Sequence, residues 1–337
     1  MNIVLDTTSP QSGARNAGPK ARLDADKTLS ELGYQIWNVP SKHFKIGRLA
    51  VLSSFFNWLK YIWRIKKDDN VIVHYPLYFY DAVLEYIALK LLCLRCKHVS
   101  FLIHDIIFLR EGEKGRVESR TLNLPSVLLA HTPSMKDTLS QFATKPEIKV
   151  LYLFDYYSSA SHIPLDELIE QKHSIAFAGN LGKSVFLRKL QGIHPSLHWK
   201  LYGNEPKNKI DFSEHVEYCG RFSSDDPSIL RGGWGLVWDG DSVDTCDGEK
   251  GNYMRYNSPH KVSLYLSCGM PVIIWSQSAL AEYVTEHRLG IAVDSLHDIC
   301  DKIDSLTDEE YGDMAANAEK IGHELKQGKF LTKLLTQ

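Results

Sequence analysis

Short apolar runs alternate with amphipathic stretches along the first half of the chain, which predicts strands and helices that follow one another. Buried parallel strands are typically compact runs of β-branched and other apolar residues that end at turn-forming residues. Such runs lie at residues 2–6, 34–39, 70–75, 99–103, 127–131 and 148–154. Apolar residues at helical spacing occupy 20–32, 49–65 and 81–95, and a further helix begins at 133. This order predicts a doubly wound α/β domain.

The same order of elements begins again near residue 174. Strands are expected at 174–177, 198–203, 216–220 and 271–275, together with the apolar run that ends at Asp239. Helical segments are expected after 184, from 259 to 268, at 280–284 and from 296 to the C-terminus. We therefore predict the α/β fold class, with two doubly wound Rossmann-like domains facing a central cleft.

Length and composition agree with two domains. A chain of 337 residues with 44% apolar residues can form two cores of ordinary size. The polar run at 155–162 is interpreted as the crossing between them. We expect one domain at 1–156 and a second at 157–320, followed by a C-terminal helix at 321–337 that returns to the first domain.

Charge and cysteine content argue against nucleic-acid partners and against a metal site. The formal net charge is −2, so any phosphate site must be local rather than a broad basic face. The six cysteines include one Cys-x-x-Cys, Cys93 and Cys96, inside an apolar helical pattern and without a second pair at zinc spacing. We interpret this pair as thiols on a helix face rather than a metal or redox site.

The N-terminal residues and the longest aromatic helix bear on location. Residues 1–6 predict a strand rather than a secretory signal, and no stretch reaches the roughly 18 to 20 continuous apolar residues that cross a bilayer. We expect a cytoplasmic protein. The helix at 49–65 carries Lys60 and Arg64, with Lys66 and Lys67 directly after it. It either packs on its own sheet, or lies on an anionic membrane or against a partner subunit.

The stretch from 233 to 275 contains a candidate phosphate site. Asn257 or Ser258 can cap a helix whose first position is Pro259, and Lys261 then lies in the first turn. Free N–H groups, the positive end of the helix dipole and an ammonium group would point at one place, which suits a phosphate. The alternative is a solvated lysine on an ordinary helix.

Glycine-bearing loops follow the first strand of each half. Residues 7–19 include Gly13 and Gly18, whose spacing does not match the dinucleotide fingerprint G-x-G-x-x-G. Residues 179–184 include Gly179 and Lys183, and the spacing between Gly179 and the Gly-Lys pair excludes a Walker A loop. Because Lys183 and Lys261 both follow strands of the second half, we expect them to converge on a diphosphate.

His104 and Asp105 stand at the carboxyl end of a predicted strand. Doubly wound folds place ligands and catalytic groups at such ends, so Asp105 is a candidate general base and His104 a candidate donor to a substrate oxygen. The equal alternative is that Asp105 caps the next helix and His104 satisfies a buried carbonyl. Residues 111–120 are dense in charge and predict a mobile loop near this site.

Four segments together resemble one bacterial family. They are WDGDSVDTCDGEKGNYMRYNSPHKVSLYLSCGMPVIIW, AGNLGK, LIHD and GARNAGPKAR. The chain resembles the galactofuranosyltransferase and serine-rich-adhesin glucosyltransferase family, whose members have the GT-B fold and use UDP-sugars. The resemblance implies a hexosyltransferase that needs neither metal nor cofactor, with the acceptor held by 1–156 and the UDP-sugar by 157–320. It also implies a homo-oligomer, for which the helix at 49–65 is a candidate surface. The family often has arginine where this chain has Lys183.

The resemblance and the chemistry together give the residues expected roles. In an inverting displacement an acceptor hydroxyl attacks the sugar from the face opposite to UDP, while Asp105 takes its proton. Asp239 and Asp241 are expected to shape their loop or bind sugar hydroxyls, and Tyr202 or Tyr218 either stacks on uracil or packs in the sheet. The residues expected to bind the UDP-sugar are Gly13, Asn16, Gly18, Gly179, Asn180, Lys183, Tyr202, Tyr218, Asp239, Asn257, Ser258, His260 and Lys261.

Three functions remain open at this point. The leading one is transfer of a galactofuranosyl unit from UDP to a surface polysaccharide such as an O-antigen or a capsule, with peripheral contact to the inner face of the cell membrane. The same resemblance admits a glucosyltransferase that extends GlcNAc on a serine-rich adhesin. The third is a non-catalytic partner protein that binds a sugar nucleotide. A nicotinamide oxidoreductase is disfavoured because neither half has the dinucleotide glycine spacing.

Overall fold

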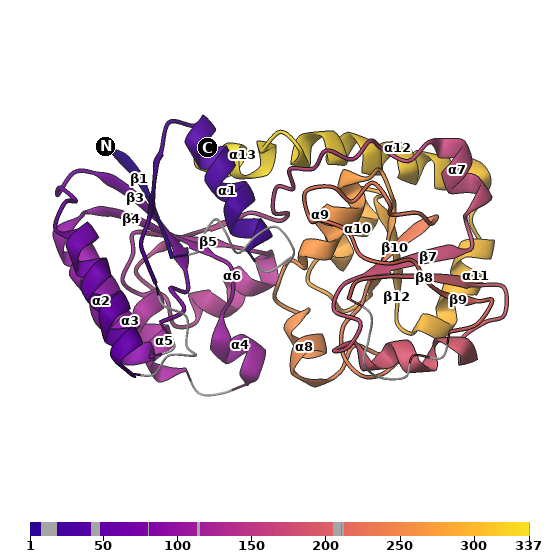
Figure 1. Cartoon of the computed structure of the whole chain (residues 1–337), viewed down its shortest axis with the longest axis horizontal. Coiled ribbons are helices and arrows are strands. Elements are labelled where there is room, and N and C mark those ends of the chain that lie inside the picture. The colour runs from indigo at the N-terminus through magenta and orange to yellow at the C-terminus, as the bar shows by residue number, and fades with distance from the viewer. Residues whose placement is uncertain are drawn as a thin grey trace. The chain divides into compact units, whose positions relative to one another are not determined.

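The chain divides into two compact units. The computed structural model describes residues 1–7, 19–41, 48–79, 81–112, 115–204, 210 and 212–336, without the side chains of 48–50. Unit 1 comprises Met1–Tyr152 and Leu331–Gln337, and unit 2 comprises Leu153–Phe330 (Figure 1). The predicted boundary at 156 lies close to the junction at 152, whereas the one at 320 falls inside a single helix, α12 (Asp308–Leu325).

Unit 1 is built on a parallel sheet of six strands in the order β2-β1-β3-β4-β5-β6. The strands are β1 (Asn2–Asp6), β2 (Gln35–Asn38), β3 (Asn70–Tyr75), β4 (His98–Ile103), β5 (Val127–Ala130) and β6 (Glu147–Val150). The helices are α1 (Lys20–Glu31), α2 (Arg48–Ile62), α3 (Ala82–Arg95), α4 (Ile107–Glu111), α5 (Arg116–Leu122) and α6 (Pro133–Ser140), with most of α13 (Lys329–Thr336). The strand order reverses between β1 and β3, which makes their carboxyl ends the topological switch point of this sheet.

Unit 2 is built on a second parallel sheet of six strands, in the order β12-β11-β10-β7-β8-β9. The strands are β7 (Ser174–Ala178), β8 (His198–Tyr202), β9 (Val216–Tyr218), β10 (Trp234–Val237), β11 (Val272–Trp275) and β12 (Gly290–Val293). The helices are α7 (Leu165–Glu170), η3 (Val185–Gly192), α8 (Gly248–Tyr253), α9 (His260–Ser267), α10 (Ala281–Glu286), η4 (Leu296–Asp298), α11 (Ile299–Asp304) and α12. Here the switch point lies between β7 and β10.

The two sheets confirm the predicted α/β class with two Rossmann-like domains. None of the helices that the structure describes combines the length and the apolar composition that a bilayer crossing requires.

Two parts of the pattern were interpreted wrongly. No strand is predicted between 284 and 296, yet Gly290–Val293 forms the edge strand β12. Four residues that include glycine and alanine carry too little of the strand signal to be recognised, although the glycine is needed in this strand. A Cβ at Gly290 would lie 1.9 Å from the carbonyl oxygen of Val272 on β11.

The predicted mobile loop at 111–120 is wrong in its second part, because Arg116–Leu122 forms α5. Glu118 of this helix is buried. Its carboxylate accepts hydrogen bonds from the backbone N of Ile107 at 3.1 Å and of Phe108 at 2.9 Å. One residue of the charge run thus faces inward, where it satisfies the first-turn donors of α4.

Helix α9 is packed between the sheet of unit 2 and α12 (Figure 1). A Cβ at Gly235 of β10 would lie 2.1 Å from a ring carbon of Tyr265, so the glycine lets that ring cross the strand. The hydroxyl of Tyr265 accepts a hydrogen bond from the backbone N of Ala178 at 2.8 Å. On the other side, a Cβ at Gly322 of α12 would lie 2.2 Å from the carbonyl oxygen of Leu266. These contacts fix α9 against β10, the carboxyl end of β7 and α12.

Candidate active site

The carboxyl ends of β7 and β10 in unit 2 form the first candidate site. Lys261, in the first turn of α9, spans the switch point between these two strands. Its Nζ donates a hydrogen bond to the carbonyl oxygen of Trp238, directly after β10, at 3.2 Å. The same ammonium lies 4.5 Å from the centre of the Phe177 ring on β7. A cation therefore stands where doubly wound sheets bind their ligands.

Gly179, the residue after β7, lets the side chain of Lys261 cross the end of that strand. A Cβ at Gly179 would lie 3.3 Å from Cε of Lys261. Gly203, after β8, has a φ of +152°, and a Cβ there would lie 2.1 Å from the carbonyl oxygen of Gly179. Two strand ends and the lysine thus meet around a residue without a side chain. The structure brings together Gly179 and Lys261, whereas the convergence of Lys183 and Lys261 on a diphosphate stays a prediction.

Helix α9 begins one residue later than predicted. Pro259 has φ −64° and ψ 124°, an extended conformation, and is itself the N-cap, so His260 is the first helical residue. The N-cap residue is therefore Pro259 rather than the predicted Asn257 or Ser258, and its own side chain makes no capping hydrogen bond. The first-turn N–H groups of α9 point toward the same helix end as Lys261, and this arrangement suits a phosphate.

Of the predicted residues at the start of α9, Ser258 is buried, whereas Asn257 and His260 are half-buried. Ser258 is 5% exposed. The Oδ1 of Asn257 is buried and accepts no hydrogen bond from the residues that the structure describes. The ring of His260 packs against Tyr156, with ring centres 5.0 Å apart. All three predicted contacts therefore sit in the wall of the site, next to the helix start.

The charge on Lys261 is subject to opposing influences. Burial lowers its pKa, while the Asp239 carboxylate and the Cys246 thiol nearby raise it. The Asp239 carboxylate also accepts a hydrogen bond from the backbone N of Gly240 at 3.0 Å. A cation that has lost water gains from a further negative group, so a bound phosphate would stabilise the charged ammonium.

The loop after β10 is shaped by its own side chains. The Oδ1 of Asp247 accepts hydrogen bonds from the backbone N of Asp241 at 2.7 Å and of Ser242 at 3.1 Å. The indole N–H of Trp238 donates to the carbonyl oxygen of Ser242 at 2.9 Å. The role of shaping the loop, which was expected of Asp239 and Asp241, is thus carried largely by Asp247, which the sequence analysis did not single out.

The loop after β7 forms a tight turn. The backbone N of Lys183 donates to the carbonyl oxygen of Asn180 at 3.0 Å and lies 3.2 Å from its Oδ1. The hydroxyl of Ser184 donates to the same carbonyl oxygen at 3.2 Å. The side chain of Lys183 is exposed, in contrast to that of Lys261. Asn180 therefore orders the loop that carries the second predicted cation.

The two tyrosines that are candidates for stacking on uracil differ in how far they are buried. Tyr202 is 2% exposed, and its hydroxyl both donates to the carbonyl oxygen of Arg231 at 3.2 Å and accepts from its backbone N at 3.0 Å. The buried position of Tyr202 fits sheet packing, the alternative given for it. Tyr218 is only partly buried, at the end of β9, and its hydroxyl donates to the carbonyl oxygen of Gly203 at 3.0 Å.

The second candidate site lies at the carboxyl end of β4 in unit 1. His104 is partly exposed, and its Nε2 lies 2.6 Å from Nδ1 of His74 on β3. Asp105 is 8% exposed and forms an ion pair with Arg110 of α4. Asp105 is not the cap of α4, because the N-cap residue of that helix is Ile106.

Two polar residues behind His104 were missed by the sequence analysis. His74 is fully buried, and its Nε2 lies 3.0 Å from Oδ1 of Asp26 on α1. One turn before Asp26, the buried Arg22 forms an ion pair with Asp6 at 2.9 Å. The sequence did contain one indication of them. Helix α1 has few apolar residues, so a face packed on the sheet must include polar side chains, and buried polar side chains need hydrogen-bond or ion-pair partners.

Three of the predicted site residues fall in a part of the chain that the structure does not describe. Gly13, Asn16 and Gly18 lie outside the residues that the structure describes. Within the described part of the chain, two side-chain groups have donor atoms close enough together to hold a metal ion. They are His162, Glu319 and His323, and His173, Cys300 and Asp304. Neither group includes a predicted site residue.

Comparison with known families and proteins gives matches over most of the chain. Residues 3–151 match the family described as glucosyltransferase 3-like, N-terminal domain, and residues 175–337 match its C-terminal domain. The chain is 30% identical over 336 residues to the beta-1,6-galactofuranosyltransferase WbbI of Escherichia coli K12, covering 96% of this chain and 94% of that protein. It is 37% identical over 255 residues to glucosyltransferase 3 of Streptococcus gordonii, covering 73% of this chain and 72% of that protein.

Solved structures with the same fold include several glycosyltransferases. Sucrose-phosphate synthase from Thermosynechococcus elongatus has a TM-score of 0.68 at 10% identity, with 100% of this chain and 97% of that chain covered. WaaG, a glycosyltransferase involved in lipopolysaccharide biosynthesis, has a TM-score of 0.61 at 12% identity, with 99% and 98% covered. HepE of Anabaena, solved with UDP-glucose, has a TM-score of 0.58 at 13% identity, with 99% of both chains covered. The fold is thus the GT-B fold that the resemblance implied.

Proposed function

The chain belongs to the glucosyltransferase 3-like family of glycosyltransferases, and from this premise we propose that it transfers a hexosyl unit from a UDP-sugar to a glycan acceptor. The observation that carries the proposal is the position of Lys261. Its ammonium stands at the switch point of unit 2, near the glycine that follows β7 and beside the first turn of α9. A helix N-terminus and a desolvated cation at one place are suited to a diphosphate.

The diphosphate is the leaving group, so its charge grows as the bond to the sugar breaks. Lys261 and the N–H groups of α9 stabilise that charge in the transition state, and the exposed Lys183 supplies a second cation from the loop after β7. A point charge at 183 replaces the planar clamp that arginine would provide. Two cations and a helix end supply the role that a divalent metal has in other transferases, and on this ground the reaction is proposed to be metal-independent.

The proposed donor is UDP-galactofuranose and the proposed acceptor a surface polysaccharide such as an O-antigen or a capsule. The support is the match to the E. coli galactofuranosyltransferase over nearly the whole of both chains. Transfer of glucose to a GlcNAc-modified adhesin is the alternative, supported by the higher identity to the streptococcal enzyme over a shorter stretch.

The displacement is proposed to invert the anomeric centre. An acceptor hydroxyl attacks the sugar carbon from the face opposite to UDP, and a base takes the hydroxyl proton. The candidates for that base are the side chains at the end of β4, Asp105 and His104.

The surface of α2 and α3 is proposed to contact an anionic membrane, where a lipid-linked acceptor would be presented. Exposed apolar side chains recur along both helices at helical spacing: Leu52, Phe56 and Trp63 on and just after α2, and Val83, Ile87, Leu91 and Leu94 on α3. Lys60, Arg64, Lys66, Lys67 and Lys90 are exposed among them. Apolar groups rimmed by cations suit the interface of an anionic bilayer.

Two donors distinguish the proposed activities. The purified chain is incubated with UDP-galactofuranose or UDP-glucose in EDTA, each with an octyl galactoside and with a GlcNAc-serine peptide, and released UDP is measured. Release from UDP-galactofuranose with the octyl galactoside supports the leading proposal. Release from UDP-glucose with the peptide replaces it with the alternative. Binding of UDP without turnover of either donor would support a non-catalytic partner protein instead.

A further inference from the structure

We propose that Asp26, His74 and His104 form a proton relay in unit 1, in which His104 is the general base of the transfer and the other two residues position it. The inference rests on the proposed glycosyl transfer, because a base is needed only if an acceptor hydroxyl is deprotonated. It assigns the base to His104 rather than to the neighbouring Asp105, and it gives roles to two residues that no motif marks.

The three side chains come from three elements and form one continuous line. Asp26 lies on α1, His74 on β3 and His104 directly after β4. Oδ1 of Asp26 is 3.0 Å from Nε2 of His74, and Nδ1 of His74 is 2.6 Å from Nε2 of His104. The two imidazole rings have centres 4.8 Å apart and planes 19° apart, so they meet edge to edge in nearly one plane, as an N–H···N hydrogen bond requires. The line runs from a buried carboxylate through a fully buried ring to a partly exposed one.

The order of donors and acceptors fixes the tautomer of each ring. A carboxylate only accepts hydrogen bonds, so Nε2 of His74 must carry the proton that it donates to Asp26. In neutral His74 the other nitrogen, Nδ1, then carries a lone pair and accepts the N–H of Nε2 of His104. In neutral His104 the lone pair is left on Nδ1. Asp26 therefore determines, through His74, which nitrogen of His104 is basic.

The same line stabilises the proton once His104 has taken it. The acceptor oxygen forms its bond to the sugar carbon while the bond from that carbon to the UDP oxygen breaks, and the hydroxyl proton moves to Nδ1 of His104. The resulting positive charge is shared through the 2.6 Å hydrogen bond with His74 and is compensated by the Asp26 carboxylate. The proton then passes to water, and UDP leaves with both electrons of the broken bond.

Asp105 is less suited than His104 to act as the general base. Its carboxylate is buried and ion-paired with Arg110, which in turn also pairs with Glu111 at 2.8 Å. The guanidinium stabilises the charged carboxylate and so makes it a weaker proton acceptor. The geometry therefore favours Asp105 as the residue that anchors the start of α4 next to His104.

Among the residues that the structure describes, charged and titratable groups on α1, on β3 and at the start of α4 lie around the relay. From α1, Arg22 pairs with Asp6 and donates to the carbonyl oxygen of Pro76. From β3 comes His74, and from α4 the pair of Asp105 and Arg110. A change in the pH dependence on substitution of Asp26 is therefore expected to report on the two histidines.

The kinetic test compares relay variants with a matched histidine variant. Wild type, His104→Gln, His74→Gln, Asp26→Asn and Asp26→Glu are assayed for kcat and donor KM, with His98→Gln as the control. His98 is an exposed histidine at the opposite end of β4. Loss of a general base costs about 10² to 10⁴-fold in rate. We expect a loss in this range for His104→Gln, a smaller loss for Asp26→Asn that Asp26→Glu partly restores, and unchanged donor KM in all of them.

The pH profile separates a positioning role from a merely structural one. An amide at 26 donates to Nε2 of His74, which reverses both tautomers and removes the charge that stabilises protonated His104. The acidic limb of the kcat profile should therefore move to lower pH in Asp26→Asn, while a variant that is only destabilised keeps the wild-type limb. A wild-type kcat in His104→Gln, together with loss of turnover in Asp105→Asn, would overturn the proposal.

A measurement that needs no turnover separates failure of the relay from failure of the transferase assignment. In ¹⁵N-labelled protein the imidazole nitrogen shifts identify the tautomer of each ring. The relay requires protonated Nε2 and unprotonated Nδ1 on both His74 and His104 at neutral pH, and a reversed pattern in Asp26→Asn. The opposite tautomer on His104 in wild type would refute the relay even if the protein transfers sugar. The expected tautomers without turnover of any donor would instead refute the transferase proposal.

Discussion

At the scale of single residues, the account depends on how closely Lys261 passes Gly179. The Cε of the lysine would be 3.3 Å from a Cβ at this position, and the adjacent Phe177 ring is 4.5 Å from Nζ, so the side chain has little room to move aside. The glycine thus controls where the ammonium can stand at the switch point.

Gly179→Ala is therefore expected to weaken UDP binding without unfolding the protein. The added methyl group displaces the lysine stem, and we expect roughly a tenfold rise in the Kd of UDP, or about 1.4 kcal/mol. Calorimetric titration measures it. Gly192→Ala is the control, because an added Cβ there meets nothing within 4 Å. Equal Kd values for the two variants would contradict the role given to Gly179.

A second residue gives the protein a pH-dependent stability. Glu85 on α3 accepts a hydrogen bond from the backbone N of Leu77 at 2.8 Å, and burial raises its pKa from 4.5 to about 7. Between these two values the folded protein binds more protons than the unfolded chain, so this carboxyl makes stability fall as pH rises from 4.5 to 7.

Glu85→Gln is expected to remove the fall in stability that the Glu85 carboxyl causes as pH rises. The amide keeps an acceptor for Leu77 but has no proton to lose, so the variant should gain up to about 3 kcal/mol relative to wild type between pH 4.5 and pH 8. Urea unfolding at several pH values in this range measures the difference. Stability curves that run parallel for the two proteins would show that the carboxyl titrates normally in the folded state.

The residues of the site divide into those that local patterns reveal and those that only tertiary contacts reveal. Gly179 and Lys261 could be found because a glycine after a strand and a lysine after a helix-starting proline are local signals. Asp26 and His74 could not, because their partnership joins residues 48 positions apart. Asp247 was missed for a similar reason: nothing in the sequence shows which of several aspartates in one loop binds the backbone.

At the scale of elements, the pattern identified long apolar strands and missed short or polar elements. The six fully buried aliphatic residues of β1 and β3 (Ile3, Val4, Leu5, Val71, Ile72 and Val73) carry a strong strand signal. Strand β12 and helix α5 lack such a signal, since the first is short and the second includes a glutamate that serves the start of α4. The positions of such elements depend on partners elsewhere in the chain.

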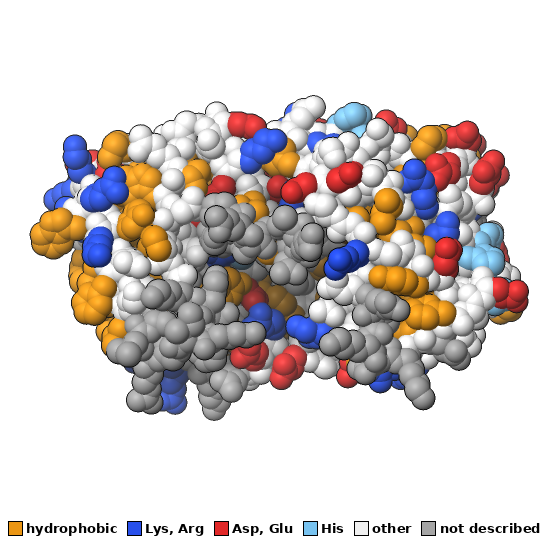
Figure 2. Space-filling view, viewed as in Figure 1, with side chains coloured by type: hydrophobic (Ala, Val, Ile, Leu, Met, Phe, Trp, Pro, Cys, Tyr) orange, Lys and Arg blue, Asp and Glu red, His pale blue; other side chains and the backbone are white. Residues whose placement is uncertain are grey.

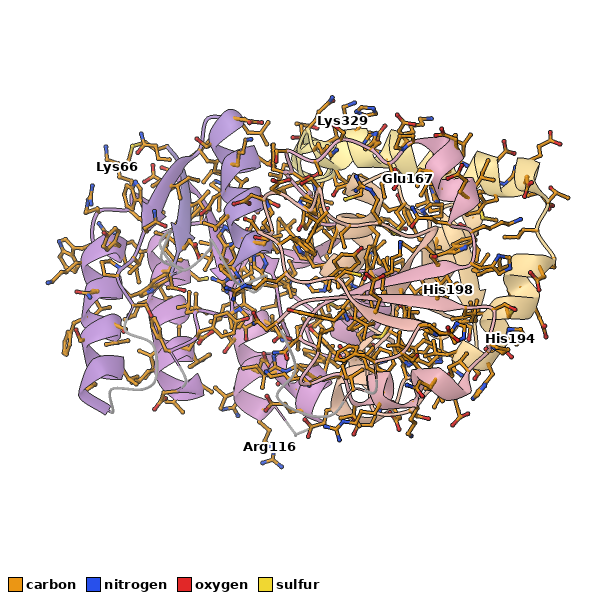
Figure 3. The ribbon with its side chains drawn as sticks, turned by 45° about the vertical axis from the view of Figure 1, so that its right-hand side comes forward. Lys66, Arg116, Glu167, His194, His198 and Lys329 are labelled. Carbon is orange, nitrogen blue, oxygen red and sulfur yellow. The ribbon has the colours of Figure 1, made fainter. Side chains whose placement is uncertain are left out.

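The α2–α3 surface is the exposed region with the clearest expected partner. Figure 2 shows hydrophobic and basic side chains next to one another on the side of unit 1 where α2 lies. Trp63 is 78% exposed, and Leu94 is 75% exposed. Figure 3 labels Lys66 at the edge of this surface. A surface of this composition favours contact with anionic lipid.

Vesicle sedimentation and Trp63 fluorescence test this contact. The full chain should bind phosphatidylglycerol vesicles but not phosphatidylcholine vesicles, and added salt should weaken binding because the lysines act through screened charges. Phe56→Ser and Leu94→Ser should each reduce binding several-fold, whereas Ile229→Ser, at an exposed apolar residue of unit 2, is the control. No vesicle binding, together with a dimer that Phe56→Ser dissociates, would instead make this surface the interface of the expected homo-oligomer.

At the scale of the whole molecule, each unit contributes one part of the proposed chemistry. Unit 2 has the strand order of a dinucleotide-binding sheet, and at its switch point stands Lys261, the cation proposed to bind the diphosphate. Unit 1 has its own switch point and carries the relay that ends at His104. The alternation of strands and helices was sufficient to predict two sheets, although it missed the edge strand β12 of the second. A Rossmann-like sheet alone does not specify its ligand, and the absence of the dinucleotide glycine spacing argued against a nicotinamide dinucleotide.

The measurement that tests the central claim most directly is the binding of UDP in EDTA to wild type, Lys261→Met and Lys189→Met. Methionine keeps most of the aliphatic stem of Lys261 and removes the charge, and Lys189 is an exposed lysine of unit 2 on η3. A ligand that binds only the folded state raises the Tm by mass action. We predict a rise with UDP in wild type and in Lys189→Met that is largely lost in Lys261→Met. No rise in wild type, or an equal rise in Lys261→Met, would contradict a diphosphate site at the switch point of unit 2.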